Sequence, residues 1–297
     1  METITDLLAR ISELQAKSKA REREESAKAS AVQTVQLPLW PEPVRAVPNG
    51  FLRSALFGAI AKGRRRYIEG EQIAALDGIE IRYTGQRLDQ GDLDVWLTIL
   101  HAARLQTLGS KCRVTSYQLL KALGKSDTGK NRAMLQKRIE RIRATALTIR
   151  QGRYSYIGGL IDEAYKDEET QEWVIVLNPK LSALFAADSF TQIEWSIRRS
   201  LDGHPLAQWL HGFYASHAQP FPVKIETLHR LCGSESGEMW KFAQTLRHAL
   251  HAVAEASAAH NQIFRYEIQG DVVCVEKTPS RSQRRHLVAK AKRKHRG

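Results

Sequence analysis

The sequence has little cysteine and no long apolar run, and both absences narrow the kind of protein that it can be. Its three cysteines, Cys112, Cys232 and Cys274, are far apart and lack metal-ligand spacing, which favours a reduced cytoplasmic protein over a disulfide-stabilised one. No apolar run approaches the roughly 20 residues of a membrane helix, and the acidic residues 1–6 do not begin a signal peptide. We therefore expect a cytoplasmic protein that makes no membrane contact.

The familiar catalytic motifs are also missing. The sequence has no G-x-x-x-x-G-K-[ST] loop to hold nucleotide phosphates, no H-E-x-x-H pair among its ten histidines, and no cysteine in a nucleophile motif. His248 and His251 could share a metal ion, but no third ligand lies nearby in the sequence, so a solvated or phosphate-facing role is favoured. We expect no enzymatic activity, no metal and no cofactor.

Positive charge is what the sequence has in excess. The formal net charge is +13, from 45 Lys+Arg against 32 Asp+Glu, a balance that favours nucleic acid or an anionic membrane as partner. Residues 281–297 hold eight of these cations and no acid, which leaves 13 − 8 = +5 for the remainder. We expect a disordered tail that binds phosphate without sequence preference, with a solubilising tail as the alternative.

The most basic internal stretch, residues 130–150, is predicted to be a DNA-binding helix. Leu135, Ile139 and Ile142 recur at helical spacing and can bury one stripe of it. A capped helix at 115–124 and a short turn precede it, which is the helix-turn-helix arrangement. The alternative is a solvated charged surface. The predicted DNA contacts of this region are Lys130, Arg132, Lys137, Arg138, Arg141, Arg143, Arg150 and Arg153.

The second half of the sequence repeats the order of elements of the first half. Helices are predicted at 204–217, 225–233 and 238–256, with a hairpin at 264–275. The long third helix is less basic, and its polar face could read bases, with glutamine suited to adenine. Its predicted DNA contacts are Lys241, Gln244, Thr245, Arg247, His248 and His251.

Two further residue types are assigned to packing. Met239 is placed in the buried stripe of the long helix at 238–256, and every tryptophan except Trp40 is interpreted as a core residue. The strands predicted between 146 and 177 are interpreted as the wing that follows the first DNA-binding helix.

These patterns predict an α+β, mainly helical protein with two tandem winged-helix domains and with flexible N-terminal and basic C-terminal extensions. Residues 1–49 form an N-terminal extension, beginning with a helix over 1–31. Residues 50–200 form the first winged-helix domain, 201–278 the second, and 279–297 the basic disordered tail.

The segment Gln36-Leu-Pro-Leu-Trp-Pro41 is apolar and extended, because its prolines prevent a helix. Such a segment can place alternate side chains in pockets on another protein. From the residues alone, docking of Leu37, Leu39 and Trp40 on the chain's own core is the favoured interpretation.

Several short motifs together resemble the TrfA replication initiators of broad-host-range plasmids. They include the segment at 36–41, Arg53-Ser-Ala-Leu-Phe57, Ile79-Glu-Ile-Arg-Tyr-Thr-Gly85, Arg143-Ala-Thr-Ala-Leu147 and Pro220-Phe-Pro-Val-Lys-Ile-Glu-Thr-Leu228, and the resemblance covers residues 33–276 in register. It implies two winged-helix domains that bind direct repeats (iterons) in the double-stranded DNA of a plasmid origin. Opening of the duplex, which exposes single-stranded origin DNA, and recruitment of DnaA and the DnaB helicase would follow.

The same resemblance implies two further properties. Gln36, Leu37, Leu39 and Trp40 match a motif that binds the DNA polymerase sliding clamp, which reverses the interpretation of this segment as a purely internal contact. A homodimer would exchange with a DNA-binding monomer in the cytoplasm of a bacterium that carries the plasmid.

Two other functions compete with replication initiation. A winged-helix transcriptional regulator, including an autorepressor, would bind a lone inverted repeat in a promoter rather than direct repeats beside its gene. A nickase or primase would show metal-dependent nicking or primer synthesis.

Overall fold

A computed structural model describes residues 36–60, 63, 65–151, 154–186, 188–280, 282–285 and 287–288. The helix predicted over 1–31, Arg153 and most of the basic tail lie outside these residues. From Gln36 onward, the described residues form one compact unit.

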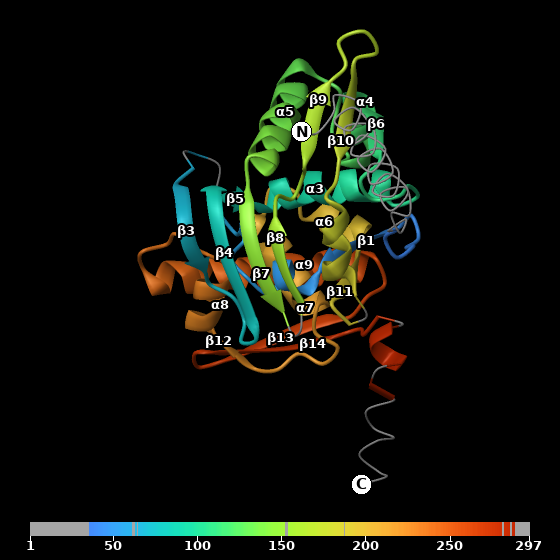
Figure 1. Cartoon of the computed structure of the whole chain (residues 1–297). Coiled ribbons are helices and arrows are strands. Elements are labelled where there is room, and N and C mark those ends of the chain that lie inside the picture. The colour runs from blue at the N-terminus through green and yellow to red at the C-terminus, as the bar shows by residue number, and fades with distance from the viewer. Residues whose placement is uncertain are drawn as a thin grey trace, which may run out of the picture. The chain divides into compact units, whose positions relative to one another are not determined.

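The first repeat of elements surrounds the basic helix. It consists of α3 (Gln90–Ala103), β6 (Lys111–Thr115), α4 (Ser116–Ala122), α5 (Gly129–Arg143), β9 (Glu163–Lys166) and β10 (Glu172–Val176). The three strands form an antiparallel sheet in the order β6-β10-β9 (Figure 1). The helix α4 begins with a capping box, in which Thr115 and Gln118 exchange hydrogen bonds between side chain and backbone.

The second repeat has the same topology. It consists of α7 (Pro205–Ala215), β12 (Val223–Lys224), α8 (Ile225–Leu231), α9 (Met239–Ala259), β13 (Phe264–Gln269) and β14 (Val272–Lys277). Its strand order, β12-β14-β13, matches that of the first sheet, because in both sheets the last strand lies between the other two. The repeated order of elements predicted from the sequence is therefore present.

A separate four-stranded sheet corrects the prediction for the strands after α5. The strands β7 (Ala146–Gln151) and β8 (Tyr154–Gly158) join β3 (Tyr67–Ile73) and β4 (Ile79–Gln86) in the order β3-β4-β7-β8 (Figure 1). Only β9 and β10 join the hairpin sheet beside α5. The pairing follows from apolar alternation, because buried Ile81 lies opposite Ile149 and buried Tyr83 lies opposite Leu147.

Smaller elements connect these parts. The helix α2 (Asn49–Leu52) is a single turn. The remaining elements are the antiparallel pair β1 (Val44–Pro48) and β11 (Phe190–Glu194), the parallel pair β2 (Phe57–Gly58) and β5 (Leu88–Asp89), the 3-10 helix η1 (Pro179–Phe185), and α6 (Trp195–Ser200).

The apolar segment at 36–41 is docked on the core. Leu37 and Trp40 are buried, and Trp40 donates a hydrogen bond from Nε1 to His101 Nδ1 over 2.9 Å while its ring stacks on Phe185. Leu39 is 66% exposed, so the sequence-based docking interpretation is correct for Leu37 and Trp40 and wrong for Leu39. In the described part of the chain, no helix has the length and apolarity to cross a membrane.

Candidate nucleic-acid interface

The helix α5 is positioned by its apolar stripe and its first turn. Leu135, Ile139 and Ile142 are buried, and the helix packs against α3 and α4. Thr128 caps the N-terminus by accepting a hydrogen bond from the Asn131 backbone N–H. The opposite face of α5 therefore points away from the core.

Two of the arginines predicted to contact DNA form ion pairs with carboxylates at the start of α3. Arg138 Nη1 lies 2.5 Å from Asp89 Oδ1 and 2.7 Å from Asp92 Oδ1, and Arg141 Nη1 lies 2.7 Å from Asp92 Oδ1. Both arginine side chains are 16% exposed. They fasten α5 to the first turn of α3, where Asp89 and Asp92 also form a capping box, and their contact with DNA stays a prediction.

Burial and ion pairing act against each other in this cluster, and the pKa of Asp92 is raised, first by burial and then by the charge of Asp89. Burial alone would raise the pKa of Asp89, but the cations of Arg138 and Arg65 outweigh it and hold that pKa below its usual value. Burial would likewise lower the pKa of Arg138, whereas the two carboxylates raise it, so its guanidinium stays charged. The positive charge of Arg138 is therefore balanced by carboxylates within the protein.

The other cations of this region differ in whether an acidic side chain lies beside them. Lys130, Lys137 and Arg143 are exposed and have no ion-pair partner among the described residues. Arg132 is exposed but lies 2.6 Å from Asp127, and Arg150, on β7, lies 3.4 Å from Glu80. The face that α5 offers to phosphate is thus much less basic than the sequence count indicated.

The hairpin beside α5 is acidic at its tip. Asp167, Glu168 and Glu169 follow β9 directly, and the two glutamates are exposed. Among the described residues, a basic side chain pairs with Asp167 alone of these three: Arg113 Nη1 lies 3.2 Å from its Oδ2. Because these carboxylates would repel phosphate, the hairpin tip is a poor DNA contact.

The helix α9 exposes all six residues predicted for it. Phe242, Leu246, Leu250 and Val253 are buried, and the helix packs on α7 and β13. Lys241, Gln244, Thr245, Arg247, His248 and His251 are exposed on the outer side. Lys241 lies 3.0 Å from Glu238 and His251 lies 3.3 Å from Glu255. Gln244, Arg247 and His248 have no side-chain partner in the described structure.

Two residues of α9 were assigned to packing and are exposed. Met239 is 42% exposed because it is the first residue of the helix and extends past the packed part. Trp240 is 64% exposed because it precedes buried Phe242 by two residues, which places it on the other side of the helix. The exposure of Trp240 could have been predicted from the sequence, since this residue falls outside the apolar period of α9.

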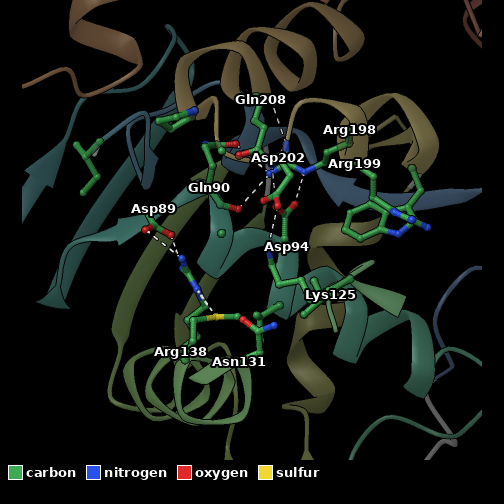
Figure 2. A pocket seen from close by; sticks show the side chains of 18 of the residues that line it. Asp89, Gln90, Asp94, Lys125, Asn131, Arg138, Arg198, Arg199, Asp202 and Gln208 are labelled. Carbon is green, nitrogen blue, oxygen red and sulfur yellow. Dashed lines mark hydrogen bonds and ion pairs between the residues drawn. The ribbon is translucent and has the colours of Figure 1, made fainter. Parts of the chain in front are cut away.

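A cavity of about 580 Å³ separates α5 from α6 and α7. Figure 2 shows Arg198 directed at Asp94 and Gln90, with Gln208 beside them, and Lys125 directed at Asp202. Gln208 Nε2 donates to Asp94 Oδ2 over 2.9 Å, and Lys125 Nζ lies 2.7 Å from Asp202 Oδ2. These charges are mutually compensated, and the Asp94–Arg198 pair joins α3 of the first repeat to α6, next to the second.

Comparison with known sequences gives one consistent group of relatives. The model of a family described as TrfA protein matches residues 2–265. The plasmid replication initiator protein TrfA of Escherichia coli is 27% identical over 255 residues, which are 82% of this chain and 65% of that protein. RepFIB replication protein A of Escherichia coli is 25% identical over 194 residues, 62% of this chain and 59% of that protein. The chain thus spans less than two thirds of the length of these relatives.

Comparison with solved structures shows a shared fold. The crystal structure of domains 2 and 3 of RctB aligns with a TM-score of 0.50 and 14% identity, over 77% of this chain and 95% of that chain. At this identity the similarity concerns the fold alone.

Proposed function

The chain belongs to the TrfA protein family, and we propose that it initiates plasmid replication by binding direct repeats at an origin through α5 and α9. The observation that carries the proposal is the pair of topologically equal units, each of which exposes the polar face of its long helix. In this proposal the units are winged-helix domains, with the boundaries predicted from the sequence at 50–200 and 201–278.

The two helices would have different tasks. Lys130, Lys137 and Arg143, which have no ion-pair partner among the described residues, would neutralise phosphates and release counterions. Gln244 and Arg247 offer donors and an acceptor for base edges in the major groove. The first unit would therefore contribute mainly affinity, and the second mainly sequence preference.

Direct repeats suit this architecture better than a palindrome does. A symmetric dimer presents the same helix twice and matches an inverted repeat. One chain with two unlike helices instead matches an asymmetric site, and a series of such sites reads as direct repeats. This argument favours an initiator over a dimeric promoter regulator.

Recruitment of DnaA, DnaB and the sliding clamp extends the proposal through the family resemblance. For the clamp, the docked segment sets a condition, because Leu37 and Trp40 are buried, whereas Gln36 and Leu39 are exposed. Clamp binding through this motif would require residues 36–41 to leave the core.

Footprinting on the DNA that flanks the gene tests the proposal. We expect protected direct repeats, and we expect a plasmid with that fragment as its only origin to replicate when the protein is supplied in trans. Protection of a lone inverted repeat in a promoter, without replication, would favour the regulator.

Salt dependence of binding to the protected fragment tests the role of α5. Lys130→Ala and Lys137→Ala should each lower the slope of log affinity against log salt by about 1. Lys180→Ala removes an exposed cation from η1 and serves as the matched control. Wild-type slopes in both α5 variants would exclude phosphate contacts by Lys130 and Lys137.

A further inference from the structure

Trp240 differs from every other tryptophan in the protein. It is 64% exposed, whereas Trp40, Trp96, Trp173, Trp195 and Trp209 are at most 7% exposed. Exposing an indole forgoes the burial of a large apolar surface, and aromatic side chains left outside the core are enriched at binding surfaces. The exposure of Trp240 therefore makes it a candidate contact for a partner.

The helical period places Trp240 at the head of the polar stripe of α9. Trp240, Gln244, Arg247 and His251 are spaced by four, three and four residues, so they lie within a narrow arc of the helix. All four are exposed, and the buried stripe lies on the other side. Trp240 thus shares its face with the candidate base-reading residues.

The surroundings of the indole are cationic and polar. Lys241 Nζ lies 5.2 Å from the centroid of the Trp240 ring, and the same ammonium is 3.0 Å from Glu238. No ring of the described residues stacks on Trp240. The indole is accordingly free to contact a partner that approaches the first turn of α9.

We propose that Trp240 enters the major groove and packs its indole against the 5-methyl group of a thymine in each repeat. The inference rests on the proposed function and adds a specificity-determining contact to it. The N-terminal residues of a recognition helix are those that reach base edges. The thymine methyl is the apolar group that the major groove offers to an apolar side chain.

Fluorescence quenching tests whether the indole is covered. Free protein should show one tryptophan component that acrylamide quenches readily, and Trp240→Phe should lack it. A saturating amount of the footprinted duplex should protect this component. If the duplex binds in a gel shift and quenching is unchanged, the inference is wrong while the proposed function stands. If no duplex binds, both fail.

A methyl-deletion cycle tests the chemistry of the contact. Trp240→Ala should weaken binding of the footprinted duplex about tenfold, and replacing the contacted thymine by deoxyuridine should weaken wild-type binding about fivefold. The two changes together should cost no more than Trp240→Ala alone. Leu105→Ala, at a side chain that is 67% exposed outside α9, is the matched control and should bind normally.

Two results of this cycle would overturn the inference. Additive losses at every thymine would mean that the indole touches no methyl group. If the wild type bound single-stranded DNA more tightly than Trp240→Ala did, while both bound the duplex equally, the indole would be assigned to unpaired bases.

Discussion

Arg141 Nη1 lies 2.7 Å from Asp92 Oδ1, and this contact ties the last turn of α5 to the first turn of α3. The Asp92 side chain is fully buried, and Arg138 shares its carboxylate. The pair fixes how α5 is rotated, and so decides which cations of α5 remain outside. A side chain that its charge alone would assign to DNA is here part of the scaffold that presents the helix.

Arg141→Ala should therefore affect stability before it affects DNA binding. Removing one of two cations from a buried carboxylate should lower the free energy of unfolding by about 2 kcal/mol. Urea unfolding measures this loss. Lys137→Ala, one turn away on the exposed face, is the matched control and should unfold as wild type does. Wild-type stability combined with a reduced salt slope would instead make Arg141 a DNA contact.

Local patterns predicted the parts of the fold that local spacing determines. The helices α5 and α9 follow from their apolar periods, and the repeated order of elements follows from its turns and caps. The partners of Arg138 and Arg141 could not be predicted, because Asp89 and Asp92 lie 46 to 49 residues away in the sequence. Both arginines do flank the buried stripe of α5, which was the available signal.

Sheet membership was less predictable still. The strand β3 was missed because it has only one buried apolar side chain, Ile68, and shows no alternation. β7 and β8 were placed in the wing because they follow α5 directly, whereas pairing with β4 depends on contacts distant in sequence. Trp240 was misassigned for a different reason, since tryptophan was treated as a core residue without regard to helical phase.

His211 makes stability depend on pH. It lies in α7, and burial, followed by the charges of Arg198 and Lys277, lowers its pKa to about 3. The unfolded chain has a histidine pKa near 6.5, so below that pH the unfolded state binds more protons than the folded state. The contribution of His211 to the free energy of unfolding therefore keeps its full value above pH 6.5 and decreases as the pH falls towards 3.

Urea unfolding between pH 7.5 and 5 measures this effect. Each such histidine should contribute at most about 1.4 kcal/mol of lost stability per pH unit below 6.5. His217, whose pKa burial lowers to about 4, acts in the same direction. His211→Gln should reduce the slope. An equal slope in wild type and His211→Gln would contradict the assignment.

The role of the docked segment at 36–41 can be tested by substitutions that weaken its contacts with the core. Trp40 stacks on Phe185 with ring centroids 6.3 Å apart, and Trp40→Ala should lower the free energy of unfolding by about 3 kcal/mol. Leu39→Ala, at an exposed side chain of the same segment, should not. His101→Ala removes the acceptor of the Trp40 indole while leaving the clamp-like motif intact.

If the clamp binds only the released segment, its apparent affinity is reduced by the fraction of molecules in which the segment is docked. His101→Ala should then increase capture of the protein by an immobilised bacterial sliding clamp, although it weakens the fold. Leu39→Ala should decrease capture without changing stability. Capture that responds to neither substitution would remove residues 36–41 from clamp binding and leave the segment as part of the core.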